Sequence, residues 1–391
     1  MGPAVLDCAH FAAGECRSCT WLGRRYDDQL AAKQDATRAL VDAPGMVWEE
    51  PVASRPDGFR NKAKMVVAGS AAAPTLGILD PAGGGIDLRD CPLHVPVVVD
   101  ALPVLADLVA RADLTPYDVA GAGPVNQRGE LKHLLVTGSP DGELMVRVVL
   151  RSTSAEARVR KHLPWLRERL PHARVVTLNV QPEHRAVLEG EREVVLTAEE
   201  TLPMRLGAIT LHLRPRSFFQ TNTEVATALY AEAASWVAEL APRRVVDLYC
   251  GVGGFALHLA AEDRHVTGIE ISAEAVTSAE RSRDEAGLPG RLDFAAGDAT
   301  APEHGGLLAE ADLVVVNPPR RGLGHELARR IEESGAPHVL YSSCNPETLA
   351  RDLADLASYT PVRGRLLDMF PQTPNAEVLV LLRRATGVRS G

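Results

Sequence analysis

Two side chains capable of covalent and acid–base chemistry lie near the end of the sequence, each beside an apolar stretch typical of a strand. Cys344 follows the run Tyr341-Ser342-Ser343, and Glu377 directly precedes the apolar residues 378–382. A thiolate adds to electron-poor carbon atoms, and a carboxylate removes a proton from such an adduct. An isolated Cys after a strand is more often a small buried hydrophobic residue. The neighbouring motifs therefore decide how Cys344 is interpreted.

A glycine-rich loop follows the strand expected at residues 245–248 and contains Tyr249, Gly251 and two further glycines. Its Gly-x-Gly-Gly pattern differs from the Gly-x-Gly-x-x-Gly of dinucleotide sites. Glu270 ends the next expected strand, roughly 20 residues further on, where a carboxylate accepts hydrogen bonds from ribose hydroxyls. Asp298 ends the third strand and is placed to accept from an adenine amino group. This spacing indicates S-adenosylmethionine (SAM); the alternative is that both acids cap the following helices.

The fourth expected strand leads into Asn317-Pro318-Pro319-Arg320, a stiff loop whose amide can face a substrate ring or simply form a rigid turn. Uracil C5 is too weak a nucleophile to take a methyl group from SAM directly. Thiolate addition at C6 activates C5, and a base must then remove the C5 proton so that the thiolate can leave. The motifs therefore predict uracil C5 methylation with Cys344 as nucleophile and Glu377 as base, while Arg320 or Gln220 helps to hold the ring oxygens.

Five runs in the C-terminal half resemble the RNA 5-methyluridine (uracil-C5) methyltransferase family and occur in the family's order. The resemblance implies the same nucleophile, Cys344, and the same base, Glu377. It also implies SAM contacts from Gln220, Tyr249, Glu270 and Asn317. The matching runs are Ser217 to Asn222, Asp247 to Gly254, Asn317 to Gly322, Ser343 to Pro346 and Phe370 to Glu377.

The sequence departs from the family pattern at two places. Many members have Asp before Pro-Pro-Arg, and we associate Asn317 with the branch that acts on 23S ribosomal RNA and lacks an N-terminal TRAM domain. Members commonly have His at the positions of Gln372 and Asn375, so the hydrogen bonding around Glu377 is expected to differ. The sequence leaves no room for a TRAM barrel ahead of the first cysteine.

Four cysteines near the N-terminus form a further candidate site: Cys8, Cys16, Cys19 and Cys91. Four thiolates suit either tetrahedral zinc or a [4Fe–4S] cluster, and their spacing alone leaves both open. Family members with this pattern carry a [4Fe–4S] cluster, so the resemblance implies the same here. The four cysteines also disfavour the transfer-RNA branch, which lacks them. The cluster is expected to be structural or RNA-contacting, since methyl transfer needs no electron, and a redox-sensing role stays open.

The elements that must position these residues divide the chain in two. Short apolar strands alternate with helical segments in the second half, which predicts an α/β fold with a mostly parallel sheet. We expect a cysteine-rich iron–sulfur region at 1–95, the rest of an N-terminal α+β RNA-binding domain at 96–205, and a Rossmann-like SAM-dependent methyltransferase domain at 206–391. The strands expected are 64–67, 144–150, 174–180, 211–213, 245–248, 265–269, 292–295, 313–316, 338–341 and 378–382.

Composition limits the partners. The formal net charge of −9 argues against non-specific coating of nucleic acid, which needs many phosphate contacts from Lys and Arg. Eight cations occur between Arg147 and Arg174, where a solvated helix surface and an RNA-contacting face explain the pattern equally well. No membrane span, secretory signal or obligate protein partner is evident, so a cytoplasmic protein is expected.

The leading hypothesis is a uracil-C5 methyltransferase that acts on a uridine flipped out of a loop of 23S ribosomal RNA. One alternative within this enzyme class is another RNA substrate, such as transfer RNA. An alternative from another class is a non-catalytic RNA-binding module that senses SAM or the cluster. A covalent adduct with RNA distinguishes the enzyme from the sensor.

Overall fold

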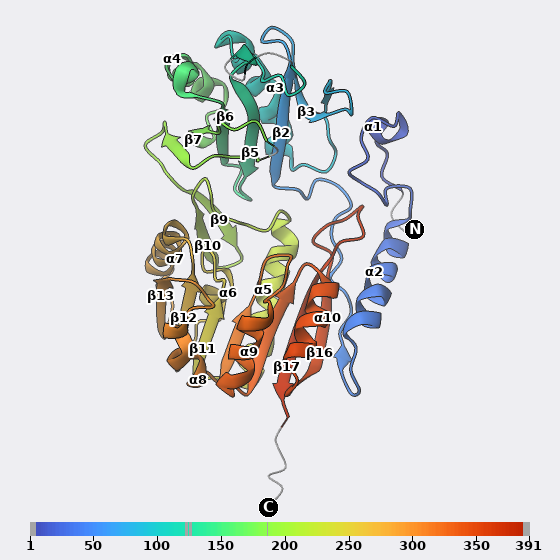
Figure 1. Cartoon of the computed structure of the whole chain (residues 1–391), viewed down its shortest axis with the longest axis vertical. Coiled ribbons are helices and arrows are strands. Elements are labelled where there is room, and N and C mark those ends of the chain that lie inside the picture. Colours follow the sequence, from blue (N-terminus) through green and yellow to red (C-terminus); the bar gives the residue numbers. More distant parts are fainter. Residues whose placement is uncertain (1–4, 122–123, 125–126, 186, 386–391) are drawn as a thin grey trace, which may run out of the picture.

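Two β-sheets, one above the other in Figure 1, organise the chain. The computed structural model describes residues 5–121, 124, 127–185 and 187–385. We call the unit around the eight-stranded sheet the lower domain and the unit around the seven-stranded sheet the upper domain. A separate hairpin of β9 (Leu202–Leu206) and β10 (Ile209–Leu213) lies where the chain passes from the upper to the lower domain.

The lower sheet is mostly parallel. Strands β15, β14, β11, β12 and β13 pair in parallel, whereas β17 is antiparallel to both of its neighbours, β15 and β16. All four residues of β14 are buried, as expected for a parallel strand covered on both faces. The strands in spatial order are β1 (Val47–Trp48), β16 (Tyr359–Leu367), β17 (Glu377–Arg384), β15 (His338–Ser343), β14 (Leu313–Val316), β11 (Arg244–Leu248), β12 (His265–Glu270) and β13 (Arg291–Ala296).

Helices cover both faces of the lower sheet. Val245 belongs to a core shared with α5 and α6, and the next residue, Val246, belongs to a second core shared with α2 (Tyr26–Val41), α9 and α10. Side-chain caps start several helices: Asn222, Ser272 and Asn345 each accept a hydrogen bond from a first-turn N–H. The helices of this domain are α5 (Thr223–Leu240), α6 (Gly254–His258), α7 (Ala273–Ala286), η3 (Pro302–His304), α8 (Gly305–Ala309), α9 (His325–Ser334) and α10 (Pro346–Asp355).

The upper sheet carries its helices on one face. Ala63, Met65 and Val67 of β2 pack with α3 and α4 in a third core, so the alternate residues of the strand face the other way. The strands in spatial order are β4 (Gly85–Asp87), β3 (Pro74–Leu79), β2 (Lys62–Gly69), β5 (Leu131–Gly138), β6 (Leu144–Leu150), β7 (Ala173–Val180) and β8 (Arg192–Val195). The helices are α3 (Pro96–Arg111), η2 (Thr153–Ala155) and α4 (Glu156–Arg169).

The N-terminal segment departs from the domain division that we expected. After α1 (Ala9–Ala12), the helix α2 (Tyr26–Val41) packs on α10 and β16, and β1 pairs in parallel with β16. Residues 26–48 therefore belong to the lower domain, although we assigned 1–95 to the RNA-binding domain. The side chains that fasten α2 are polar: Lys33 and Asp368 form an ion pair of 2.6 Å in which both side chains are completely buried. Because these buried side chains of α2 are polar, the buried face of the helix is not visible as an apolar pattern in the sequence.

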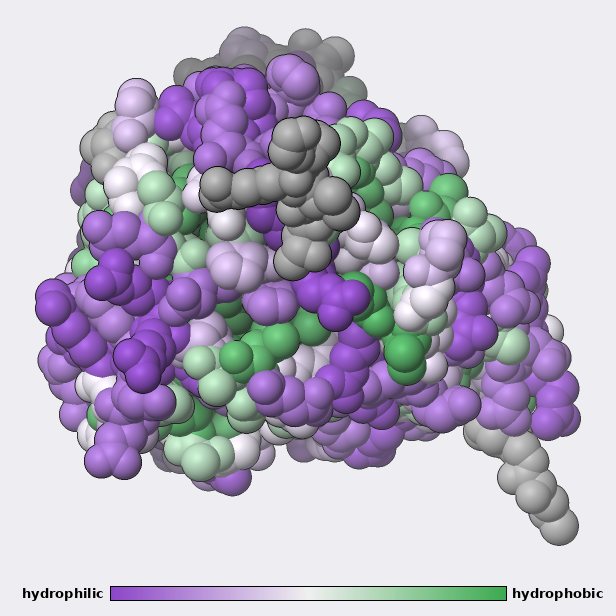
Figure 2. Space-filling view, turned by 90° about the horizontal axis from the view of Figure 1, so that it is seen from below, coloured by the Kyte–Doolittle hydropathy of each residue, from purple (hydrophilic) through white to green (hydrophobic). Residues whose placement is uncertain are grey.

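Figure 2 shows the end of the lower domain that is remote from the upper domain, where hydrophilic and hydrophobic residues are interspersed. Within the described ranges, no helix has both the length and the apolar composition that a membrane span needs.

Candidate active site

The parallel strands of the lower sheet bring most of the expected site residues to one edge. Since β11 to β15 run in the same direction, the residues that follow them share the edge that faces the upper domain. Tyr249, Glu270, Asp298, Asn317 and Cys344 each end or follow one of these strands. This is the edge at which open α/β sheets bind their ligands.

Cys344 directly follows β15, and Glu377 is the first residue of the neighbouring antiparallel strand β17. The register between these strands ends with the pair of Ser343 and Val378, so Cys344 and Glu377 adjoin the same end of the two strands. Burial raises the pKa of the Cys344 thiol, the negative charge of Glu377 raises it further, and the charge of Arg320 lowers it. The charges of a nearby carboxyl and a nearby guanidinium group therefore act on this thiol in opposite directions.

Glu377 has the environment of a general base that works near neutral pH. Its side chain is 1% exposed, and the Ser342 hydroxyl donates to its Oε1 at 2.5 Å. Burial raises the pKa of Glu377 to about 7, and the hydrogen bond from Ser342 opposes this shift. A carboxyl group with a pKa near the working pH is present as carboxylate and still holds an abstracted proton strongly.

A hydrogen-bonded bridge ties the Pro-Pro-Arg loop to the loops that carry the nucleophile and the base. Arg320 Nη2 donates to Asn375 Oδ1 at 3.0 Å, and Asn345 Nδ2 donates to the backbone carbonyl of Arg320 at 3.2 Å. Asn345 also caps α10 directly after Cys344. Asn375, at a position where the family pattern commonly has His, thus binds Arg320.

The glycine-rich loop is closed by the acid of the next strand. The N–H groups of Gly251 and Ser272 donate to the two carboxylate oxygens of Glu270 at 3.1 and 3.0 Å. Tyr249 adopts a φ of 61°, the left-handed region, and turns the chain out of β11. A carboxylate has roughly four acceptor positions, so Glu270 can still accept from ribose hydroxyls.

Asp247 is a residue that the sequence analysis did not single out. It is completely buried beside the loop, and Oδ2 accepts from the N–H of Ala256 at 2.9 Å. Its Oδ1 is buried without a hydrogen-bond partner in the described structure, and burial raises the pKa of Asp247 to about 8. An orphaned acceptor here fits a cationic donor such as the amino group of SAM. The signal in the sequence was an acid at the end of the strand that leads into the loop.

The remaining expected SAM residues differ in exposure. Gln220 is buried, and its backbone carbonyl accepts from Asn61 Nδ2 of the upper domain at 2.9 Å. Asn317 is half-buried. Asp298 is exposed; its Oδ1 accepts from the N–H and the hydroxyl of Thr300, each at 2.8 Å, which lowers its pKa and leaves Oδ2 for a ligand.

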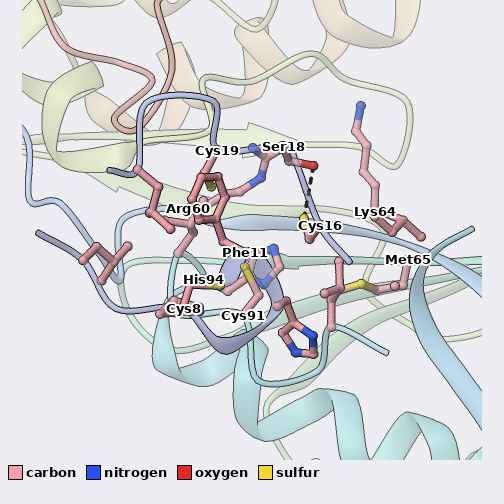
Figure 3. Close-up of a pocket in the computed structure, with 18 residues that line it drawn as sticks. Cys8, Phe11, Cys16, Ser18, Cys19, Arg60, Lys64, Met65, Cys91 and His94 are labelled. Carbon is pink, nitrogen blue, oxygen red and sulfur yellow. Dashed lines mark hydrogen bonds between the residues drawn. The ribbon is translucent and has the colours of Figure 1, made fainter. Parts of the chain in front are cut away.

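The four N-terminal cysteines line one cavity of about 240 Å³, shown in Figure 3. All four are free thiols, and the charge of Arg60 interacts with those of Cys19 and Cys91. Within residues 5–385, apart from the few positions not described, no group of three or more His, Cys, Asp or Glu side chains is arranged to hold a single metal ion. The four cysteines therefore share one cavity.

A clamp of hydrogen bonds connects the segment after Cys19 with the loop before Glu377. The N–H of Trp21 donates to the carbonyl of Gln372 at 3.0 Å. The side chain of Gln29 accepts from the N–H of Gln372 at 3.0 Å and donates to its side-chain Oε1 at 2.9 Å. Gln372 has a φ of 66°, a conformation that residues other than glycine rarely adopt, so these bonds hold an unfavourable turn in place.

The arginine-rich segment is mainly engaged within the protein. Arg147 is buried on the face of the upper sheet that carries no helices, and it pairs there with Glu189 and Glu193. Arg160 pairs with Glu156 one turn away on α4, a solvated helix surface. These contacts favour the structural interpretation for this segment over an RNA-contacting face.

Fold and site together define a SAM-dependent methyltransferase whose cofactor loop lies beside a cysteine and a buried carboxyl. Two family models match: "tRNA (Uracil-5-)-methyltransferase" over residues 309–385 and "Methyltransferase small domain" over residues 208–340. The tRNA (uracil-54, C5)-methyltransferase of Pyrococcus abyssi, solved with S-adenosyl-L-homocysteine, has the same fold. It superposes with a TM-score of 0.76 at 23% identity, covering 93% of this chain and 85% of the other.

The names of relatives with higher sequence identity specify the RNA and the uridine that those relatives methylate. The 23S rRNA (uracil(747)-C(5))-methyltransferase RlmC of Halothiobacillus neapolitanus is 49% identical over 97% of this chain and 100% of the relative. The protein of the same name from Yersinia pestis is 48% identical over 96% of this chain and 99% of the relative. The chain belongs to this family of 23S rRNA (uracil-C5)-methyltransferases, which confirms the resemblance found in the sequence.

Proposed function

We propose that this enzyme methylates C5 of one uridine in 23S ribosomal RNA, at the position that its relatives' names give as 747, through a covalent adduct between Cys344 and C6. The observation that carries the proposal is the pairing of Ser343 with Val378, which sets Cys344 against the buried Glu377 beside the cofactor loop. Near-complete coverage of relatives named for this reaction supports the choice of substrate.

In the proposed mechanism each residue carries out one step. The Cys344 thiolate forms a bond to C6 of a flipped uracil, and the ring electrons move to C5 and O4, where a cationic donor such as Arg320 stabilises the charge. SAM supplies the methyl group that C5 then takes. Glu377 removes the C5 proton, the electron pair of the C5–H bond restores the C5–C6 double bond, and the Cys344 thiolate leaves.

The covalent step is tested with RNA that contains 5-fluorouridine at the target. Fluorine at C5 replaces the proton that Glu377 removes, so the wild-type enzyme should form a methylated adduct that persists on a denaturing gel. The Cys344→Ala variant should form none. Cys250→Ala, which removes the buried thiol within the cofactor loop, should still form it. An adduct with Cys344→Ala would reject the nucleophile assignment.

The substrate is tested by mapping 5-methyluridine in ribosomal RNA from a strain that lacks the protein. Loss of methylation at one 23S uridine, restored by the wild-type gene and not by Cys344→Ala, is the expected result. Loss of methylation from transfer RNA instead would show that transfer RNA is the substrate. Full methylation at every such site would support the non-catalytic alternative.

We also propose that Cys8, Cys16, Cys19 and Cys91 hold a [4Fe–4S] cluster. The donor set fits, because four free thiols line one cavity and Arg60 lies near enough to offset thiolate charge. The cluster would join the cysteine loop at α1 to the segment before α3 and takes no part in methyl transfer.

Metal analysis of protein purified without oxygen tests the cluster. We expect roughly four irons and four sulfides per chain and broad visible absorbance. Cys91→Ser should lose the iron, whereas Cys250→Ser should retain it. One zinc per chain without sulfide would contradict the assignment.

A further inference from the structure

A second large cavity, of about 450 Å³, lies in the upper domain and shares no lining residue with the sites described above. Its floor includes Val66 of β2 and His133 of β5, which are paired across the two strands, together with Leu79 at the end of β3. Rings of Tyr117 and His184 belong to its wall. The volume lies within the roughly 300–1,000 Å³ of typical small-ligand sites.

The wall of this cavity is fixed before any ligand arrives. The Tyr117 hydroxyl and His184 Nδ1 are hydrogen-bonded at 2.8 Å, and the two ring centroids are 5.9 Å apart. Lys132 Nζ lies 4.5 Å from the centroid of the Tyr117 ring and donates to the carbonyl of Glu183 at 2.6 Å. Pre-formed aromatic and apolar surfaces bind flat rings without the cost of ordering side chains.

The lining carries charges at Lys132, Glu183 and Arg185, and its other side chains are neutral or apolar. Burial, and then the charge of Lys132, lower the pKa of His133 to about 4, so its ring is neutral at pH 7. Two apolar side chains that line the cavity, Val119 and Val187, are 42% and 40% exposed. The carboxylate of Glu183 is paired with Arg185. The cavity therefore suits an aromatic ring with a polar edge better than an isolated charge.

A row of cations leads from the candidate active site to this cavity. Lys62, Lys64 and Val66 alternate on one face of β2, and Asn61, just before them, bonds to the carbonyl of Gln220. Five residues of strand, from position 61 to Val66, span about 17 Å, which a few extended nucleotides can bridge. Lys64 is exposed. Lys62 is more buried, and burial, followed by the charges of Arg147 and Lys64, lowers its pKa to about 8.

We propose that this cavity, the distal base pocket, receives an unpaired nucleobase of the substrate RNA a few nucleotides from the target uridine, while Lys62 and Lys64 contact the intervening phosphates. The inference rests on the proposed RNA substrate and adds a second point of recognition. Stacking of one base on such a surface is sequence-tolerant, so the pocket reads the presence of an unpaired base at a fixed distance from the target.

The test combines a filled pocket with abasic RNA. Val66→Trp fills the pocket from its floor, and Val47→Trp, at an exposed position of β1 at the far edge of the lower sheet, is the matched control. Binding of a 23S fragment that contains the target loop is measured by fluorescence anisotropy, with the intact RNA and with single abasic nucleotides near the target. For the wild type, one abasic position should weaken binding about tenfold, as loss of one stacked base does.

Val66→Trp should weaken binding of the intact RNA by a similar factor and should no longer respond to that abasic position, while Val47→Trp should behave as the wild type. Should Val66→Trp fail to fold by circular dichroism, Val187→Trp at an exposed lining position replaces it. Unchanged affinity of the filled variant, or equal binding of every abasic RNA by the wild type, overturns the inference. Failure of the wild type to methylate the intact RNA would instead overturn the proposed function, because the binding comparison does not depend on turnover.

Discussion

Burial of a single carboxyl group, Glu377, sets the pH at which the proposed reaction can finish. The group must be ionised to remove the C5 proton, and burial raises its pKa to about 7. The charged form is thus favoured above that pH and lost as the pH falls through it. A solvent-exposed Glu, with a pKa of about 4.3, would stay ionised throughout this range.

We therefore expect release of the methylated RNA to slow as the pH falls through about 7, by roughly tenfold per unit well below the pKa. Single-turnover release measured across this range checks the sign. Glu377→Gln should accumulate methylated enzyme–RNA adduct and lose this pH dependence. A profile that falls with increasing pH, or rapid turnover by the variant, would assign the base to another group.

For single residues, the sequence was enough to propose those whose side-chain type and position at the end of a strand indicate their chemistry. Cys344 and Glu377 could be proposed as nucleophile and base because each adjoins an apolar strand and several family motifs occur beside them. The roles of Ser342 and Asp247 could not, since they depend on which atoms are buried and which lack partners. The same holds for Gln372, whose substitution for His is visible in the sequence but whose partner, Gln29, is more than 300 positions away.

At the level of secondary structure, helix α2 supports the loop that precedes the proposed base. Its buried face consists of Tyr26, Gln29, Lys33, Thr37 and Val41, four of them carrying polar groups. Its contacts with the loop before β17 fix the turn that precedes the proposed base. An apolar periodicity is the main sequence signal of such a helix, which is why we did not expect α2 in the lower domain.

The clamp between α2 and this loop predicts an effect of Gln29→Ala on rate and stability. The substitution leaves the N–H of Gln372 buried without its acceptor, a loss of about 1–3 kcal/mol. Urea denaturation should show this destabilisation, and kcat should fall more than the affinity for RNA. Gln34→Ala, half-buried on the same helix, is the control. Equal effects of both substitutions on kcat would show that the clamp has no specific role in catalysis.

For the whole molecule, RNA binding must overcome a net charge of −9. Attraction therefore depends on local cations such as those of β2, and each contact to a single-stranded phosphate contributes about 0.7 to the slope of log affinity against log salt. Lys64→Ala should lower that slope by this amount and weaken all RNA fragments alike. Arg160→Ala, a cation already paired on α4, should leave the slope unchanged. An unaltered slope for Lys64→Ala would show that Lys64 does not contact the RNA phosphates.

The α/β class and the parallel strands of the lower sheet could be predicted because buried parallel strands are short apolar runs between loops. The assembly of the two halves could not. β5 and β16 were not recognised as strands, and the placement of residues 26–48 rests on pairings with the last part of the chain. Such long-range partners leave no local pattern.

The place of β17 has a consequence for biosynthesis. This strand is the last of the described chain, yet it lies inside the lower sheet between β15 and β16, and it begins with Glu377. During translation, β16 and β1 therefore have no strand that joins them to β15 until residues 377–384 have left the ribosome. The proposed nucleophile and base meet only after β17 has been synthesised, so chains that end before Glu377 cannot carry out the complete reaction.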